Sequence, residues 1–176
     1  PGDLVLSHPW KAVLRCPPLT SEWIAQPFPH QVSIVDEWLE DTRGAIGFSW
    51  GAWLLLCAVH ERIERGIEAP NLLLLSGVLG EGHYTGTGNW KAPRQETIFK
   101  ALGLEASPAP TPFSPQKLRF VYGREDTITP AGLSQRLVDA GHSTIELEAG
   151  HQLRSGSARN ALSQEFRRLE HHLRPR

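Results

Sequence analysis

The sequence predicts an α/β fold in which a mostly parallel sheet is covered by helices on both faces. From residue 33 onward, short apolar runs alternate with segments whose apolar residues recur at helical spacing. Residues 71–76 contain four consecutive leucines, which is typical of a central parallel strand. At Gly47-Phe48-Ser49-Trp50-Gly51, glycines flank a serine between an apolar run and a helix-like segment. This pattern indicates a sharp turn from strand to helix.

The remaining elements follow from apolar spacing and from capping residues. Apolar runs at 4–8 and 11–16 predict either a hairpin or one long kinked strand, because two parallel strands need a longer crossover. Next we expect a helix at 33–40 capped by Ser33, a strand at 45–48 and a helix at 50–65. The later elements are a strand at 71–76, a short helix at 94–102, a strand at 117–122, a helix at 131–140, a strand at 143–147 and a closing helix at 158–173.

Length and composition favour one domain over residues 1–176. Within it, residues 77–89 read as a glycine-rich loop and 107–115 as an extended, proline-stiffened connector. The whole segment 77–115 is predicted to be a lid or substrate-entrance segment. The net charge of −1 offers no footprint for nucleic acid.

Membrane and compartment signals are also weak in this sequence. The longest apolar run, 52–59, is too short to span a bilayer, and we expect no signal-like segment ahead of the fold. Cys16 and Cys57 fall in different predicted elements. Reduced thiols in a cytoplasmic protein are therefore favoured over a disulfide.

A serine becomes a nucleophile when a base takes its proton and an acid orients that base. Sites in such sheets lie at the carboxyl ends of the strands, which serves as a filter. Of the eight histidines, His151 lies just past the strand at 143–147, whereas His142 lies at its amino end. Asp126 follows the strand at 117–122, with Glu125 as the alternative acid. We therefore predict Ser49 as nucleophile, His151 as base and Asp126 as acid.

Acyl transfer also needs donors for the developing oxyanion. The backbone N–H of Trp50, next to Ser49, is one candidate. Pro9 has no N–H, so the N–H of Trp10 is the candidate after the first strand. The side chains of Trp10, Trp50 and Trp53 either line an apolar acyl pocket or belong to the core. His83 either touches a substrate or is an exposed loop residue.

Four stretches together resemble a known family. They are Gly47-Phe48-Ser49-x-Gly51-Ala52, Leu75-Ser76-Gly77, Gly123-x-x-Asp126-x-x-x-Pro130 and Gly150-His151, which cover roughly residues 44 to 155. The chain resembles the α/β-hydrolases, and among them the phospholipase/carboxylesterase group that includes acyl-protein thioesterases. The resemblance implies a small α/β-hydrolase fold and a metal-independent serine esterase or thioesterase.

The sequence departs from this group near the site. The group usually has Gln where this chain has Trp50, and an HG-type loop where it has His8-Pro9. The amino-terminal part of this chain is also shortened or rearranged relative to that group. These departures motivate an alternative function: a catalytically weak binding or interaction protein on a hydrolase scaffold.

The leading prediction is hydrolysis of a small carboxylic ester or thioester through an acyl-enzyme. A peptidase or lactonase remains open within the same chemistry. The predicted partner is a small-molecule substrate, with no nucleic acid and no membrane span. The sequence lacks H-E-x-x-H, paired C-x-x-C, Walker and dinucleotide patterns, so we expect no metal and no cofactor.

Overall fold

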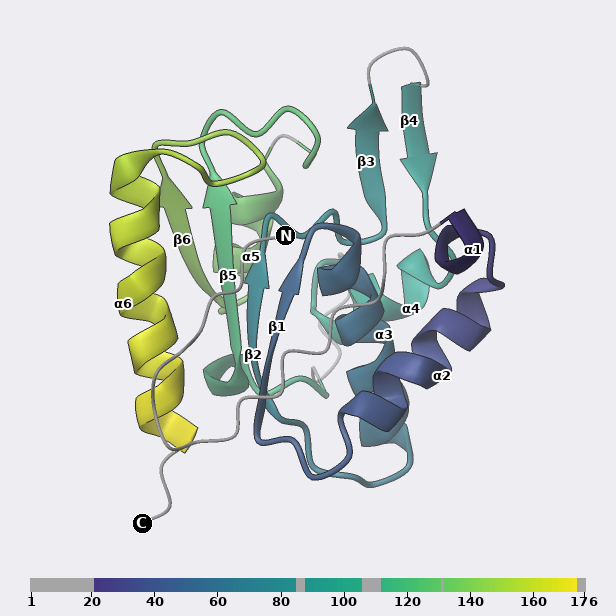
Figure 1. Cartoon of the computed structure of the whole chain (residues 1–176). Helices are drawn as coiled ribbons and strands as arrows, with labels where there is room; N and C mark the ends of the chain where they lie inside the picture. Colours follow the sequence, from purple (N-terminus) through teal and green to yellow (C-terminus); the bar gives the residue numbers. More distant parts are fainter. Residues whose placement is uncertain (1–20, 85–87, 106–111, 131, 174–176) are drawn as a thin grey trace.

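The centre of the protein is a four-stranded parallel sheet in the order β1-β2-β5-β6 (Figure 1). The structure is a computed structural model that describes residues 21–84, 88–105, 112–130 and 132–173. The four strands are β1 (Gly44–Phe48), β2 (Asn71–Leu75), β5 (Leu118–Gly123) and β6 (Ser143–Leu147). The sheet matches the predicted strands after residue 40 to within two residues at each end.

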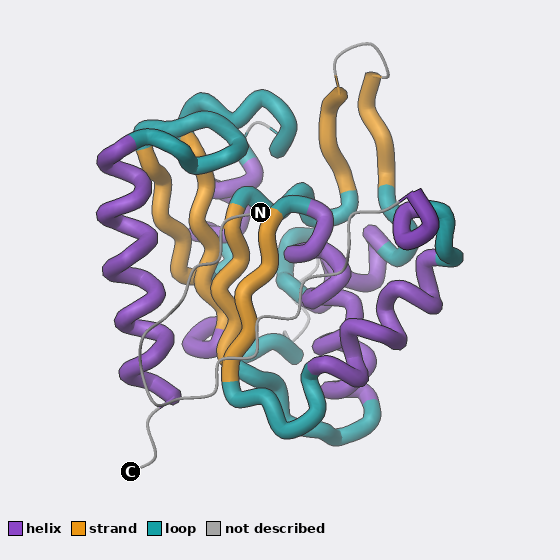
Figure 2. The backbone as a smooth tube through the Cα atoms, viewed as in Figure 1, coloured by secondary structure: helices purple, strands orange, loops and turns teal. Residues whose placement is uncertain are grey.

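The register of the sheet brings the carboxyl ends of its strands to one rim. Phe48 pairs with Leu75, Leu75 pairs with Val121, and Gly123 pairs with Leu147. The loops that follow these strands therefore leave the sheet at the same end. Figure 2 shows the loops after β5 and β6 gathered at that upper end of the sheet.

Helices cover both faces of the sheet, as predicted. Because side chains alternate along a strand, the leucines of β2 divide between two apolar clusters. Leu72 and Leu74 pack with the helices of one face, and Leu73 and Leu75 pack with α6 on the other. The first face carries α2 (Phe28–Trp38), α3 (Trp50–Glu64), α4 (Gln95–Ala101) and α5 (Leu133–Asp139), and the second carries α6 (Gly156–Leu173).

The helix predicted at 33–40 begins earlier than expected. It is α2, which starts at Phe28 with Pro27 as its N-cap residue and Pro29 in its first turn. Proline is tolerated there because the first helical amides have no partner within the helix. Ser33 lies inside the helix, so its predicted role as the cap is wrong. A further short helix, α1 (Ser21–Ile24), was not predicted.

The glycine-rich stretch 77–89 is not simply a loop. It contains β3 (Glu81–Tyr84), which pairs antiparallel with β4 (Gly88–Lys91). In Figure 1 this hairpin extends beyond the end of the main sheet where the parallel strands finish. Further on, a short 3-10 helix, η1 (Pro115–Lys117), leads into β5. The strands predicted at 4–8 and 11–16 lie outside the described residues.

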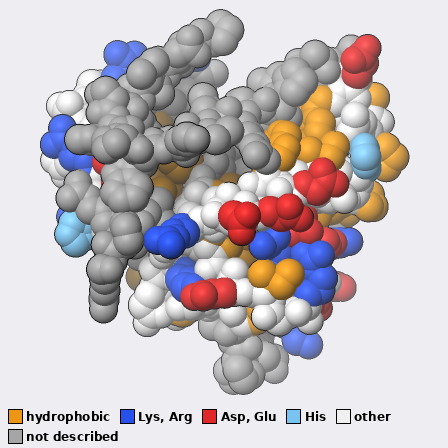
Figure 3. Space-filling view, turned by 60° about the horizontal axis from the view of Figure 1, so that its bottom comes forward, with side chains coloured by type: hydrophobic (Ala, Val, Ile, Leu, Met, Phe, Trp, Pro, Cys, Tyr) orange, Lys and Arg blue, Asp and Glu red, His pale blue; other side chains and the backbone are white. Residues whose placement is uncertain are grey.

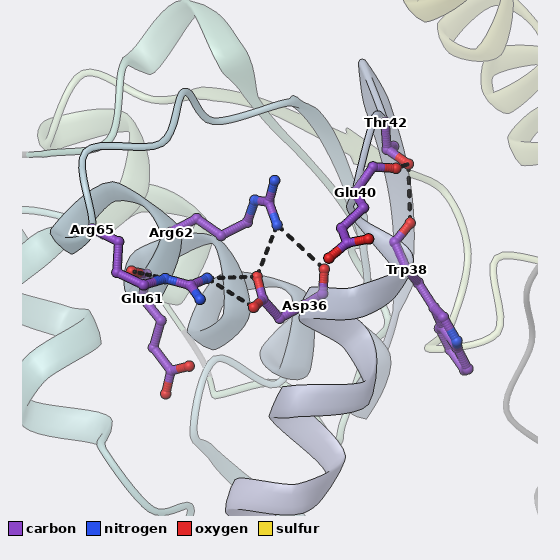
Figure 4. Close-up of polar contacts among 7 residues, drawn as sticks. All are labelled: Asp36, Trp38, Glu40, Thr42, Glu61, Arg62 and Arg65. Carbon is purple, nitrogen blue, oxygen red and sulfur yellow. Dashed lines mark hydrogen bonds and ion pairs between the residues drawn. The ribbon is translucent and has the colours of Figure 1, made fainter.

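An ion-pair cluster fastens α2 to α3 (Figure 4). The carboxylate of Asp36 accepts hydrogen bonds from Arg62 Nη1 at 2.9 Å and from Arg65 Nη2 at 2.7 and 2.8 Å. Burial alone would raise the pKa of Asp36, but the two guanidinium groups lower it below its usual value.

On the face turned forward in Figure 3, acidic and basic side chains are interspersed rather than separated by sign.

Cys57 is the free cysteine of the described part of the chain and is fully buried in α3. Burial raises the pKa of its thiol to about 12, so the unreactive thiol form persists. Cys16 lies outside the described residues.

Among the helices that the structure describes, none combines the length and apolar character needed to cross a bilayer.

Candidate functional site

Ser49 occupies the strained corner between β1 and α3. Its backbone has φ +53° and ψ −119°, a conformation that residues with a side chain rarely adopt. The corner is held because the N–H of Ser49 donates to the carbonyl of Leu75 at 2.9 Å. The chain thus turns sharply from strand to helix at Ser49, as the sequence pattern predicted.

The two flanking glycines have different roles. A Cβ added to Gly47 would lie 2.7 Å from the backbone Cα of Ala52, so only glycine fits. At Gly51 an added Cβ would meet nothing within 4 Å among the described residues. Close approach of the helix backbone therefore demands glycine at Gly47, whereas none of the described residues demands it at Gly51.

Three side chains distant in the sequence meet at the rim. His151 Nε2 lies 2.9 Å from Ser49 Oγ, and His151 Nδ1 lies 2.9 Å from Asp126 Oδ2. With the proton on Nδ1, the imidazole donates to the carboxylate and accepts from the serine hydroxyl. The structure thus brings together Ser49, His151 and Asp126, which we call the serine cluster. The His151 and Asp126 side chains are only 13% and 3% exposed.

The backbone that carries His151 is fixed against the end of β5. The N–H of Glu125 donates to the carbonyl of Ala149 at 3.0 Å, and the N–H of Arg124 donates to the carbonyl of Leu147 at 2.8 Å. A Cβ on Gly123 would lie 2.2 Å from the Ala149 carbonyl oxygen. The loop before His151 therefore depends on the absence of a side chain at Gly123.

Asp126 is held as a carboxylate by several donors. Its Oδ1 accepts from the N–H groups of Ile128 at 2.8 Å and Thr129 at 3.0 Å. Its Oδ2 accepts from the Thr129 hydroxyl at 2.8 Å as well as from His151. Burial alone would raise the pKa of Asp126, but these hydrogen bonds lower it to about 2. Asp126 does not cap α5, whose N-cap residue is Gly132.

The competing residues lie elsewhere. His142 is buried at the opposite end of β6, where its Nε2–H donates to the Leu102 carbonyl at 2.8 Å. His60 lies in α3, 3.5 Å from Glu64. Glu125, the alternative acid, is exposed. His83 belongs to β3, but its side chain is not among those described.

The oxyanion donors and the tryptophans are only partly described. The N–H of Trp50 opens α3 directly after Ser49, at the positive end of the helix dipole. The Trp50 indole N–H donates to Gln31 at 3.2 Å, on the side of α2. Trp53 is fully buried against Gly80, so it belongs to the core. Trp10 lies outside the described residues.

Two contacts of the serine cluster were not predicted. One is the hydroxyl of Thr129 on Asp126, and the other is the ring of Phe48, whose centroid lies 5.4 Å from that of His151. Thr129 could have been noticed because Asp-x-x-Thr commonly closes a local turn. Among the described residues, no group of three or more His, Cys, Asp or Glu side chains could hold a metal ion.

No protein-family model and no curated protein matches the sequence. Solved structures do match. A monoacylglycerol lipase from Paleococcus ferrophilus aligns with a TM-score of 0.53 and 14% identity, over 84% of this chain and 76% of that chain. A structure of the metagenome-derived lipolytic enzymes LipS and LipT aligns with a TM-score of 0.51 and 13% identity, over 86% and 76% of the two chains.

A predicted CIB-like hydrolase from Thermoplasma acidophilum also aligns, with a TM-score of 0.51 and 12% identity over 81% of this chain. The chain spans 60% of that protein and 60% of a carboxyl esterase 2 from Tuber melanosporum. At these identities the likeness concerns the fold: the chain has an α/β-hydrolase fold.

Proposed function

We propose that this protein is a serine hydrolase that cleaves small carboxylic esters or thioesters through an acyl-enzyme. The observation that carries the proposal is the pair of 2.9 Å contacts that link Ser49 to His151 and His151 to Asp126. In this order the imidazole can take the proton of the hydroxyl, while the carboxylate orients the imidazole and stabilises its charged form. The proposed chemistry uses side chains and backbone amides and requires no cofactor.

In the proposed acylation, Ser49 Oγ forms a bond to the substrate carbonyl carbon while its proton passes to His151 Nε2. The tetrahedral intermediate collapses as the bond to the leaving group breaks, and His151 gives the proton to that group. In deacylation, water loses a proton to His151 and attacks the acyl carbon. The bond between Ser49 Oγ and the acyl carbon then breaks, His151 returns the proton to Oγ, and the acid leaves. Asp126, ionised at neutral pH, fixes the imidazole tautomer and stabilises the imidazolium.

We propose the N–H groups of Trp50 and Trp10 as the oxyanion donors. The N–H of Trp50 opens α3 directly after Ser49, at the positive end of the helix dipole, which supports its role. Trp10 lies outside the described residues, so its role as the second donor stays a prediction from the sequence.

The segment 77–115 remains our proposal for the substrate entrance. Its hairpin, β3 and β4, projects from the end of the sheet that carries the serine cluster (Figure 1). The closer resemblance to the acyl-protein thioesterase group and a cytoplasmic location likewise stay predictions from the sequence. The resemblance favours a small ester or thioester as the substrate.

The proposal is tested with a fluorophosphonate probe and with p-nitrophenyl acetate and butyrate. We expect the probe to label Ser49, and Ser49→Ala to remove labelling and lower turnover by roughly 10⁴-fold or more. Labelling that persists in Ser49→Ala would show that another residue reacts. A folded wild-type protein with neither labelling nor hydrolysis would favour the alternative, a binding protein on a hydrolase scaffold.

A further inference from the structure

Phe48, the residue before the proposed nucleophile, lies against the imidazole of His151. It ends β1, and because side chains alternate along a strand, it points away from the face on which Gly47 meets α3. Its ring centroid is 5.4 Å from that of His151, with the planes tilted by 52°. The Phe48 side chain is nevertheless 45% exposed. It thus offers a partly exposed aromatic surface beside the proposed reacting atoms.

The route of the proton determines what such a surface can touch. His151 Nε2 must hand its proton to the leaving-group oxygen, which therefore comes within about 3 Å of that nitrogen. Carbon atoms bound to this oxygen continue outward past the imidazole. A leaving group that passes the imidazole on the side of Phe48 would meet its ring. The acyl chain would extend from the other side of the reacting carbon.

We propose that Phe48 binds the leaving group and makes the enzyme favour esters of apolar alcohols, above all alcohols that carry an aromatic ring. This inference rests on the proposed function and narrows its substrate class. Aromatic pairs gain from offset or edge-to-face contact in addition to burial of apolar surface. The selectivity that a contact of this kind provides is on the order of tenfold in kcat/KM.

Ile46 provides a matched control. It lies two residues before Phe48 on the same side of β1, and at 46% its side chain is equally exposed. If substrate preference changed only because apolar surface was removed from this strand, alanine substitution at either position would change it equally. Contact with the leaving group requires proximity to His151, which the ring of Phe48 has. Ile46→Ala is therefore expected to leave substrate preference unchanged.

The experiment compares kcat/KM of wild type, Phe48→Ala, Phe48→Leu and Ile46→Ala on two ester series. One series keeps the acetyl group and varies the alcohol from methyl to butyl to benzyl. The other keeps the methyl alcohol and lengthens the acyl chain. We expect Phe48→Ala to lose roughly tenfold more on benzyl acetate than on methyl acetate, Phe48→Leu to lose less, and the acyl-chain preference to stay as in wild type.

Equal losses of Phe48→Ala on all esters would overturn the inference, because they would show that the ring merely supports His151. A changed acyl-chain preference would overturn it too, by placing the ring in the acyl site. Melting curves and fluorophosphonate labelling confirm that each variant is folded and reactive. A wild-type protein that neither labels nor hydrolyses any ester would refute the proposed function itself, and this inference with it.

Discussion

Gly123→Ala is the most direct test of how the serine cluster is positioned. Gly123 is the last residue of β5, and the backbone of Ala149 and Gly150 crosses it immediately before His151. A methyl group there would lie 2.2 Å from the Ala149 carbonyl oxygen and 2.6 Å from that of Gly150, whereas ordinary contact begins at 3.4 Å. Both neighbours are backbone atoms, so neither can rotate away. The loop must move instead.

The size of the effect follows from these distances. To restore ordinary contact, the backbone at residues 149–150 must retreat by about 1 Å, and His151 is attached directly to it. His151 Nε2 now lies 2.9 Å from Ser49 Oγ, so such a shift takes the pair out of hydrogen-bonding range. A misplacement of about 1 Å lowers rates by about 10²-fold. Overpacking is expected to destabilise the fold by roughly 1–3 kcal/mol as well.

The assay is kcat/KM on p-nitrophenyl butyrate together with the rate of fluorophosphonate labelling, at a temperature where melting curves show the variant to be folded. Gly51→Ala is the matched control, because a Cβ added to this glycine of the serine motif would meet no described residue within 4 Å. It should stay within about twofold of wild type, since alanine is the better helix former. A folded Gly123→Ala protein that reacts as fast as wild type would refute the reasoning.

Two further predictions concern stability. Asp36→Ala should lower the free energy of unfolding in urea by roughly 2 kcal/mol, because the 12%-exposed Arg62 loses its carboxylate partner and keeps only its hydrogen bond to the backbone carbonyl of residue 36. Arg65→Ala, at an exposed position, should cost less than about 1 kcal/mol, and equal costs would contradict this. Burial lowers the pKa of His142, although its bond to Leu102 opposes the shift. Below about pH 6.5, His142 binds a proton in the unfolded chain but not in the folded chain, so the free energy of unfolding should fall toward pH 5. If His142→Gln shows the same dependence of this free energy on pH, His142 is not its origin.

The serine cluster could be predicted from the sequence because each member carries a local signal. Ser49 has the glycine motif, and Asp126 and His151 each follow a recognisable strand. The rule that sites lie at the carboxyl ends of parallel strands then excluded His142, which the structure places at the opposite end of β6. Neither the 2.9 Å contacts nor the tilt of a ring could be obtained from spacing, since they depend on the register of the sheet.

The elements that were not predicted from the sequence contain residue types that suit more than one kind of structure. Pro27 and Pro29 lie ahead of the helix predicted at 33–40, yet proline suits the first turn of a helix as well as it suits a loop. The strands β3 and β4 are rich in glycine and lack apolar alternation, so their pairing shows only in the fold. The contact of Phe48 with His151 joins residues about a hundred positions apart in the sequence and has no local signature.

At the rim, hydrogen bonds to neighbouring strands hold two strained residues in place. Ser49 and Ser76, each directly after a strand, have positive φ values of 53° and 45°, and Leu153, in the loop between β6 and α6, has 51°. Such conformations cost roughly 1–3 kcal/mol each and persist only where the surroundings enforce them. The N–H of Ser49 donates to Leu75 on the next strand, and the N–H of Ser76 donates to Val121 on the one after. Ser49 and Ser76 are thus each hydrogen-bonded to a neighbouring strand, so the geometry of Ser49 is fixed before any substrate arrives.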